Sequence, residues 1–326
     1  MFAFLAPVTK LKSFRDGEYM NVAFDAFEWV KARYNTMEVN LVNFKNEEIL
    51  SHLVKDIEKL SKLLTKMIFV FDGEIMNSRK KKLSDLKSSS IMGIDDAYEY
   101  KNKGYTNIFL GEMKKYFIPS IELMELLFDK LKSKSFEVIK APYDSVAYLS
   151  ALVNNGTIDM AFTDDPSIHL FQPSVVGFHF LNDYTYSCVS LSDILEFYSL
   201  KKKQLTELLC ISGQGLIKTP SFLGLTGFLK LFQKGNTLEE TIKSLSLPKE
   251  FISNLNKEIS EIEFRKNKLE VVEQSSLLEK NSSPIKEKIQ LDLFGNECIS
   301  SPSKKKKKTA PHQQSNTLVS YFKEEN

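Results

Sequence analysis

The stretch Met67-Ile68-Phe69-Val70-Phe71-Asp72-Gly73 is an unbroken apolar run that ends in an acid and a glycine. A short run of this kind, rich in aromatic residues, predicts a strand that is buried on both faces of a sheet. Just before it, residues 46–66 carry apolar side chains at steps of three and four, which predicts an amphipathic helix with Asn46 as its N-cap. A helix followed by a buried strand is the repeating unit of a parallel sheet.

The same alternation of strands and helices continues along the chain. The patterns predict strands at residues 21–24, 136–139 and 158–162, further β-like runs at 175–180 and 186–191, helices at 118–132 and 145–154, and a mostly helical region at 192–247. We therefore expect an α/β fold with a mostly parallel sheet and helices on both of its faces.

The composition is that of a folded soluble protein with one atypical end. Of the 326 residues, 42% are hydrophobic and 26% are charged, which excludes a wholly disordered or fibrous chain. No apolar run reaches the roughly 18 residues of a membrane span, so no membrane partner is expected. The three cysteines lack metal-ligand spacing, which argues against a zinc site and a disulfide framework. The net charge of +2 hides a Ser- and Lys-rich end that we expect to be a disordered tail.

Four acids follow or closely follow predicted strands, namely Asp25, Asp72, Asp144 and Asp165. Ligands of an open α/β sheet bind beyond the carboxyl ends of its strands, so we expect these carboxylates to converge there. Clustered carboxylates repel one another unless cations lie between them, and hard ions such as Mg²⁺ prefer oxygen ligands. The alternative is that each acid is only a loop residue or a helix N-cap.

Five segments carry a further signal. They are Val70-Phe71-Asp72-Gly73, Ala141-Pro142-Tyr143-Asp144, Thr163-Asp164-Asp165, Leu209-Cys210-Ile211-Ser212-Gly213 and Leu223-Gly224-Leu225-Thr226-Gly227. In this order and spacing they resemble the XPG family of structure-specific 5′ nucleases, the group of the flap endonucleases and exonuclease 1. The resemblance runs, with gaps, from Val22 to Leu247. It implies a PIN-like 5′-nuclease fold with a helical arch and a helix–hairpin–helix region, and branched or flap DNA as the partner.

The resemblance also divides the chain into three regions. Residues 1–110 correspond to the N-terminal nuclease region of the family, and residues 111–258 to its internal nuclease region with the helix–hairpin–helix. Residues 259–326 are left as the disordered, Lys-rich tail.

By this resemblance, the ligands of Mg²⁺ or Mn²⁺ would be the four acids Asp25, Asp72, Asp144 and Asp165. Three other acids of the family are replaced here by Val146, Ser167 and Gly215, and Asp164 is a conceivable substitute ligand. The incomplete set implies a nuclease whose activity is reduced or lost, with one ion rather than two as an alternative. Phe2 also replaces a family glycine, and its bulk would hinder a close approach of the backbone to DNA.

A basic segment follows Asp72. By the resemblance, Arg79 would contact the scissile phosphate as a catalytic residue, while Lys80, Lys81 and Lys82, together with Gly224, would bind DNA. The second phosphate-binding position of the family falls at Leu86, beside Lys87. The alternative for the lysines is a solvated helix face.

Aromatic residues are frequent in the region expected to form the arch, namely Tyr98, Tyr100, Tyr105 and Phe109. Aromatic rings of this kind stack on single-stranded bases in some proteins. They are equally typical of a hydrophobic core, so both interpretations stay open.

The end of the chain contains a short apolar cluster, Leu318, Tyr321 and Phe322, in a polar surrounding. Such a cluster is expected to dock on a partner. It resembles the box that binds the PCNA-type sliding clamp, although Ser315 stands where glutamine is usual. Residues 290–294 resemble the shorter clamp-binding peptide of bacterial replication proteins, or are an incidental apolar patch. The run Lys304 to Lys308 favours nuclear import, phosphate contact or simple solubility, and we expect a nuclear protein.

Three functional hypotheses remain. The first is a flap endonuclease or 5′–3′ exonuclease that acts in DNA replication or repair together with a sliding clamp. The second is a protein of the same fold that binds branched DNA without cutting it. The third is an interaction scaffold that no longer binds nucleic acid. The number of surviving acids separates the first hypothesis from the others, and the basic cleft separates the second from the third.

Overall fold

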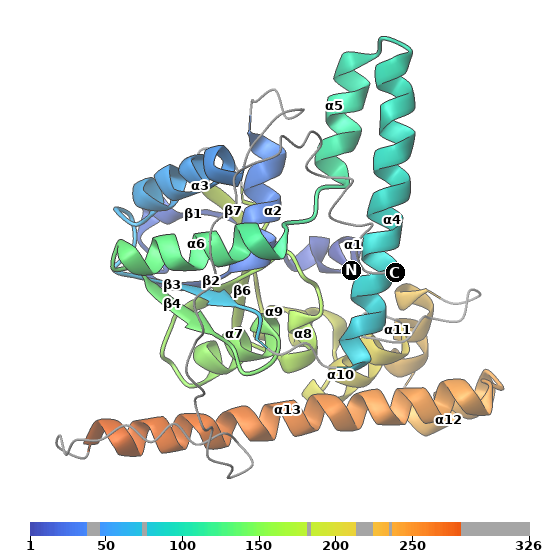
Figure 1. The fold of residues 1–326 in the computed structure, drawn as a ribbon. Helices are drawn as coiled ribbons and strands as arrows, with labels where there is room; N and C mark the ends of the chain where they lie inside the picture. The colour runs from blue at the N-terminus through green and yellow to red at the C-terminus, as the bar shows by residue number, and fades with distance from the viewer. Residues whose placement is uncertain (38–45, 74–76, 181–183, 213–223, 235–236, 282–326) are drawn as a thin grey trace, which may run out of the picture. The chain divides into compact units, whose positions relative to one another are not determined.

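The computed structural model describes residues 1–37, 46–73, 77–180, 184–212, 224–234 and 237–281. Within these residues the strands form one seven-stranded sheet in the order β1-β7-β6-β5-β2-β3-β4 (Figure 1). The strands are β1 Lys10–Ser13, β2 Asn21–Asp25, β3 Lys66–Phe71, β4 Glu137–Lys140, β5 Met160–Phe162, β6 Val175–Phe178 and β7 Thr185–Ser190. The five strands from β6 to β4 are parallel, and β7 pairs antiparallel with both β6 and β1. The predicted α/β fold with a mostly parallel sheet is confirmed.

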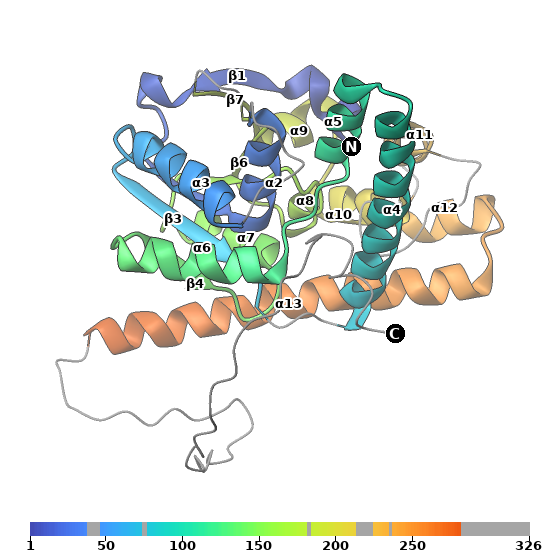
Figure 2. The same ribbon diagram turned by 45° about the horizontal axis from the view of Figure 1, so that its top comes forward.

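Side chains of β3 alternate between two hydrophobic clusters, which explains its unbroken apolar sequence. Ile68 and Val70 face the cluster that includes α7 (Ser145–Asn154), α9 (Leu191–Tyr198) and α10 (Lys202–Ile211). Met67, Phe69 and Phe71 face the cluster that includes α2 (Ala26–Thr36), α3 (Asn46–Leu60) and α6 (Ile121–Ser133). Helices therefore cover both faces of the sheet, as Figure 1 and Figure 2 show.

The helices have the following bounds. They are α1 Phe2–Leu5, α2 Ala26–Thr36, α3 Asn46–Leu60, α4 Asn77–Asn102, α5 Thr106–Lys115, α6 Ile121–Ser133, α7 Ser145–Asn154, α8 Ile168–Phe171, α9 Leu191–Tyr198, α10 Lys202–Ile211, α11 Leu225–Gln233, α12 Leu238–Ser244 and α13 Lys249–Asn281, with short 3₁₀ helices at Ala6–Val8 and Phe14–Asp16. The helix predicted for residues 46–66 ends earlier, because residues 61–65 form the turn into β3. No helix in the described part of the chain is long and apolar enough to span a membrane.

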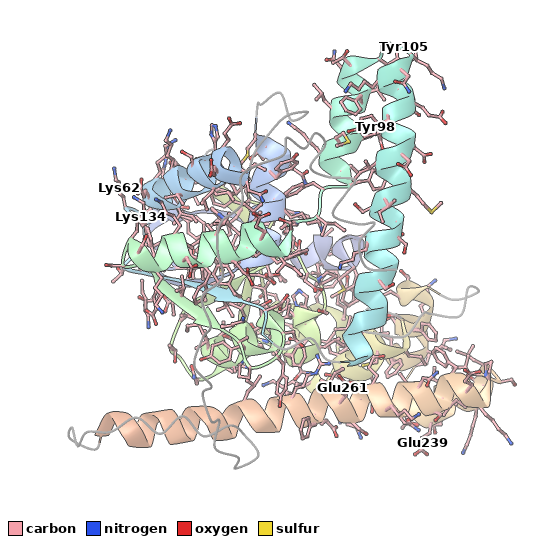
Figure 3. The ribbon with its side chains drawn as sticks, in the orientation of Figure 1. Lys62, Tyr98, Tyr105, Lys134, Glu239 and Glu261 are labelled. Carbon is pink, nitrogen blue, oxygen red and sulfur yellow. The ribbon has the colours of Figure 1, made fainter. Side chains whose placement is uncertain are left out.

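Helices α4 and α5 form a hairpin at the place where the arch was expected (Figure 1). Phe109 is fully buried in its small core with Ile94, Ala97 and Met113. Tyr98 packs against Phe109, with 5.5 Å between the ring centroids. Tyr105, by contrast, lies at the tip of the hairpin (Figure 3) and is 56% exposed, and Tyr100 is also exposed. Of the four aromatics, Phe109 is therefore core, whereas the tyrosines at 100 and 105 are accessible.

The expected start of the disordered tail at residue 259 is wrong. Residues 259–281 belong to helix α13. The reason is packing, because Leu255, Ile262 and Leu269 recur every seven residues and are buried in the same cluster as α7. The tail motifs at 290–294, Lys304 to Lys308, Leu318, Tyr321 and Phe322 lie outside the described residues.

The predicted boundary at residue 110 separates regions whose strands are interleaved in the sheet. Strands β2 and β3 lie between β5 on one side and β4 on the other. Residues 1–279 form one compact unit by their internal contacts. Acids far apart in the sequence thus reach the same edge of the sheet.

Candidate functional site

Three neighbouring parallel strands end at one edge of the sheet, and each has an acid at its last residue or just beyond it. Asp25 is the last residue of β2, where it pairs in register with Val70 of β3. Asp72 lies one residue beyond the end of β3, and Asp165 follows β5, the other neighbour of β2. The expected convergence of these three acids at the carboxyl ends of the strands agrees with this topology.

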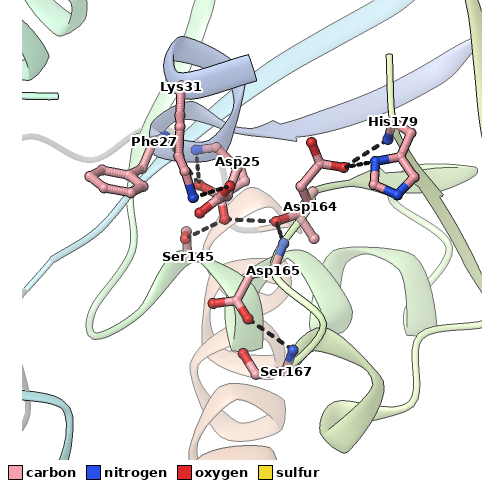
Figure 4. A network of polar contacts seen from close by, with 10 residues as sticks. Asp25, Phe27, Lys31, Ser145, Asp164, Asp165, Ser167 and His179 are labelled. Atoms are coloured by element: carbon pink, nitrogen blue, oxygen red, sulfur yellow. Dashed lines mark hydrogen bonds and ion pairs between the residues drawn. The ribbon is translucent and has the colours of Figure 1, made fainter. Parts of the chain in front are cut away.

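Asp25 is at the centre of a hydrogen-bonded network (Figure 4). One carboxylate oxygen, Oδ1, accepts hydrogen bonds from the backbone N–H groups of Phe27 and Glu28, so Asp25 caps α2. The other oxygen, Oδ2, accepts from the hydroxyls of Ser145 at 3.2 Å and Thr163 at 3.0 Å. Both oxygens of this buried carboxylate are therefore occupied by hydrogen-bond donors of the chain.

The electrostatic surroundings of Asp25 disfavour its charge. Burial raises the pKa of Asp25 well above its usual value, since the ionised carboxylate loses its hydration. The carboxylates of Asp72, Glu28 and Asp165 add to the rise in pKa by repulsion. Glu28, whose own pKa is raised by burial, lies in the first turn of α2 and forms an ion pair with Lys31 at 3.5 Å. Its proximity to the site was not predicted, although it follows Asp25 by one helical turn.

Ser145 and Thr163 connect the acids. The backbone N–H of Ser145 donates to Asp72 Oδ1 at 2.7 Å, while its hydroxyl donates to Asp25. The Thr163 hydroxyl donates to Asp25 and accepts from the backbone N–H of Asp165 at 3.0 Å. Neither residue was predicted to act in the site. The available signal was their place, because Ser145 directly follows one of the segments that resemble the family and Thr163 begins another.

Asp144 is held differently from the other acids. As the N-cap of α7, its Oδ1 accepts from the backbone N–H of Ala147 at 2.9 Å. Its Oδ2 forms an ion pair with Arg265 Nη1 of α13 at 2.5 Å. The same guanidinium also pairs with Glu261, which lies one turn earlier in α13 (Figure 3). The side chains of Asp144 and Arg265 are only 5% and 7% exposed, so this is a buried ion pair.

Asp164 and Asp165 point to different partners (Figure 4). Asp164 Oδ1 accepts from the backbone N–H of His179 at 2.7 Å and lies 3.5 Å from His179 Nδ1. Asp165 Oδ1 accepts from the backbone N–H of Ser167 at 2.9 Å. The suggested role of Asp164 as a substitute metal ligand finds no support in this geometry, because its carboxylate is engaged with His179.

Two of the three positions where the family has acids and this chain has none are occupied here by residues that stabilise the fold. Val146 is 1% exposed and belongs to the hydrophobic cluster under the sheet. Ser167 precedes α8 and donates its backbone N–H to Asp165. The third position, Gly215, lies outside the described residues.

The predicted DNA-binding residues are described only in part. Arg79 and Lys80 to Lys82 belong to the first turns of α4, but their side chains lie outside the description, as do those of Phe2 and Leu86. Lys87, farther along the same helix, is exposed. Gly224 is exposed and is the N-cap of α11, and its role in binding DNA stays a prediction.

A pair of divalent ions does not fit the site as it is arranged. Among the described side chains, no group of three or more His, Cys, Asp or Glu residues is placed to hold a metal ion. Asp25 has both oxygens engaged by donors, and Asp144 faces a guanidinium, whose positive charge repels a metal cation. The assignment of Asp25, Asp72, Asp144 and Asp165 as metal ligands therefore stays a prediction.

Comparisons with known proteins agree with the fold and with one of its segments. Residues 135–215 match the family model of the XPG I-region. No curated protein matches the chain. The resemblance to the XPG family in sequence is thus confirmed in the part of the chain that holds Asp144, Asp165 and Ser167.

Solved structures of XPG-type nucleases share the fold. The catalytic core of Rad2 in complex with DNA substrate is 17% identical, with a TM-score of 0.54, and the match covers 80% of this chain and 79% of that one. Human GEN1 in complex with Holliday junction DNA is 18% identical, with a TM-score of 0.54 and coverage of 84% and 65%. Flap endonuclease-1 from Methanococcus jannaschii is 14% identical, with a TM-score of 0.55 and coverage of 80% and 81%. At these identities the likeness establishes the fold alone.

Proposed function

We propose that this chain, which carries an XPG I-region and the fold of XPG-type nucleases, binds branched or flap DNA in replication or repair and cuts it slowly or not at all. The observation that carries the proposal is the buried ion pair between Asp144 and Arg265. A carboxylate that the family resemblance assigns to a metal ion is instead neutralised by a side chain of the protein.

Further features of the site support weak cleavage. Two of the positions expected to hold acids are Val146, which is part of the core, and Ser167. The two-metal mechanism of phosphodiester hydrolysis depends on ions that clamp the attacking and leaving oxygens. The loss of several ligands removes several kcal/mol of transition-state stabilisation, and every 1.36 kcal/mol is a factor of ten in rate.

Binding of DNA is supported by the fold and by the placement of basic sequence. The similar structures of Rad2 and GEN1 are complexes with DNA. The sheet edge that carries Asp25, Asp72 and Asp165 is called the acidic edge. In this chain the segment Arg79 to Lys82 lies in the first turns of α4, six residues beyond Gly73 at this edge. Lysine and arginine at such a place gain affinity by neutralising phosphates, independently of the base sequence.

The binding test uses a fluorescent 5′-flap DNA titrated with the protein at several salt concentrations. Replacing Arg79, Lys80, Lys81 and Lys82 by alanine should weaken binding at least about tenfold and reduce the slope of log K against log [salt] by up to about 3.6, since each phosphate contact contributes about 0.9. The matched control replaces four exposed lysines on or beside α3 and α6, namely Lys55, Lys62, Lys130 and Lys132, and should leave the affinity near that of the wild type. No measurable affinity of the wild-type protein at low salt would favour the scaffold hypothesis instead.

The proposal extends to a sliding clamp and to the nucleus. Leu318, Tyr321 and Phe322 would bury one aliphatic and two aromatic side chains in a clamp pocket, which is consistent with micromolar affinity after the peptide is ordered. A peptide covering residues 310–326 should bind a PCNA-type clamp in calorimetry, and alanine at both aromatic positions should abolish binding. A peptide that shows no heat of binding at high micromolar concentration would remove the clamp from the proposal. The run Lys304 to Lys308 supports nuclear import.

A further inference from the structure

The C-terminal helix α13 places a buried charge network against the start of α7. Arg265 reaches Asp144 across 121 residues of sequence and holds Glu261 with its other terminal nitrogen. Asp144 and Arg265 are both almost fully buried, while Glu261 is 23% exposed. A single guanidinium thus joins two carboxylates, one of them in the candidate site.

Arginine is suited to this position by its shape. Its planar fork presents several donors in fixed directions and stays charged at all relevant pH values, so it can satisfy two carboxylates at once. Lysine would offer only a point charge on a flexible stem. The choice is informative because only four of the 44 basic residues of this chain are arginine.

The network also offsets part of the negative charge that the acids bring to the site. Carboxylates crowded at the ends of parallel strands repel one another, and this repulsion must be reduced by cations or by hydrogen bonds. Here Ser145, Thr163 and backbone N–H groups provide hydrogen bonds to Asp25, and Arg265 provides the positive charge for Asp144. Every one of these partners is part of the chain.

We propose that Arg265 is a built-in counter-cation, which α13 delivers to Asp144 so that this buried carboxylate is stable without a divalent ion. This inference rests on the proposed function only in treating Asp144 as something other than a metal ligand. It makes α13 a required part of the folded unit, although the helix lies beyond the region that resembles the XPG family.

The first test is thermal unfolding of the full-length protein without DNA. Circular dichroism would be recorded with EDTA, with millimolar Mg²⁺ and with millimolar Mn²⁺, at constant ionic strength. A ligand that binds only the native state raises Tm. We expect Tm to agree within about 1 °C in all three solutions. A rise of several degrees with either ion would show that the native protein binds it, and this would overturn the inference.

The second test compares a single variant with a double variant. Arg265→Met keeps the length of the side chain and removes its charge, which leaves Asp144 buried without its partner and should lower Tm by about 10 °C. Adding Asp144→Asn to that variant should restore much of the loss, because the unpaired charge is gone. Arg33→Met serves as the matched control, since Arg33 pairs with the more exposed Asp56 and should contribute less. An Arg265→Met protein as stable as the wild type would contradict the inference.

The outcomes are separable from those of the proposed function. If Arg265→Met is not recovered folded but the double variant is, the inference stands, and if neither folds, the ion titration of the wild type decides. A protein whose Tm ignores divalent ions and which also fails to bind DNA would refute the proposed function while leaving the role of Arg265 intact.

Discussion

Asp25 and Asp144 show how two acids of the same sequence pattern acquire different roles from their surroundings. Both are N-caps and both are buried. Asp25 is surrounded by other carboxylates and by hydroxyls, and burial raises its pKa well above the usual value. Asp144 is paired with a guanidinium. The residue type and its distance from a strand do not determine this difference, whereas the partner supplied by the fold does.

His169 gives a prediction for pH dependence. Burial lowers the pKa of this imidazole from 6.5 to about 4, with Asp165 opposing the shift. Between these values the unfolded chain binds more protons than the folded one, so the free energy of unfolding falls as the pH drops from 6.5 to 4. Because one pKa unit corresponds to 1.36 kcal/mol, the loss attributable to His169 is about 3 kcal/mol.

The measurement is urea unfolding of the wild type and of His169→Gln at pH 7 and at pH 4. The stability difference between the two proteins should change by about 3 kcal/mol in favour of the variant as the pH is lowered. Subtracting one protein from the other removes the contribution of Asp25, whose raised pKa has the opposite effect. A difference that is independent of pH would show that His169 does not titrate as proposed.

The burial of Val146 predicts that an acid cannot be introduced at this position without a loss of stability. Val146→Glu would bury a carboxylate in an apolar cluster next to an already acidic edge, and should lower the free energy of unfolding by at least about 3 kcal/mol. The matched control, Val146→Ala, loses only packing and should lower it by roughly 1–2 kcal/mol. Chemical denaturation of both variants makes the comparison. A Val146→Glu protein of wild-type stability would mean that this position opens to solvent.

At the scale of elements, the site depends on close contact between the segment after β3 and the segment before α7. The backbone N–H of Gly73 donates to the carbonyl oxygen of Tyr143 at 2.6 Å. A Cβ atom at Gly73 would lie 1.8 Å from the carbonyl oxygen of Ala141, which is a clash with backbone. This glycine is therefore required by proximity rather than by its torsion angles.

Gly73→Ala should lower the free energy of unfolding by more than about 2 kcal/mol, because two backbone segments must move apart. Gly111→Ala in α5 is the matched control, since a Cβ there meets nothing within 4 Å, and the change should be neutral or stabilising by up to about 1 kcal/mol. Thermal melts of the two variants compare them. Equal stability of the two proteins would contradict the close approach.

Helix α13 gives a prediction about where the folded unit ends. A chain ending at residue 258 loses Ile262, Arg265 and Leu269, and should be destabilised by several kcal/mol or fail to fold. A chain ending at residue 281 keeps all three and should unfold like the full-length protein. Calorimetric unfolding of the two shortened chains checks this, and wild-type stability of the shorter one would contradict the assignment of α13 to the core.

The sequence predicts elements well where one local pattern dominates. Met67 to Phe71 and the helix from Asn46 have strong periodicity, and both form as expected. Strand β1, Lys10–Ser13, was not predicted, because it is a short edge strand with exposed residues and little apolar content. The repeat of Leu255, Ile262 and Leu269 was present in the sequence, but the Ser- and Lys-rich composition of the end of the chain favoured a tail. Long-range partners such as Arg265 and Asp144 leave no local pattern at all.

At the scale of the whole molecule, the fold and the candidate site give different indications. The fold is that of XPG-type nucleases, with strands of two sequence regions interleaved in one sheet. The acidic edge is preserved in outline, yet its carboxylates are engaged by hydroxyls, backbone N–H groups and a guanidinium. Under the proposed function, a chain whose acids are engaged in this way is expected to bind DNA better than it cuts it.

The most direct test of this account is a 5′-flap cleavage assay in Mg²⁺ and in Mn²⁺, run under conditions where binding has been measured. The account predicts that bound flap DNA is cut at least ~10³-fold more slowly than by a nuclease of this fold with a full set of metal ligands. It also predicts that Asp72→Ala changes this low rate little. Rapid Mg²⁺-dependent cleavage that Asp72→Ala abolishes would contradict the account and establish the chain as a working nuclease.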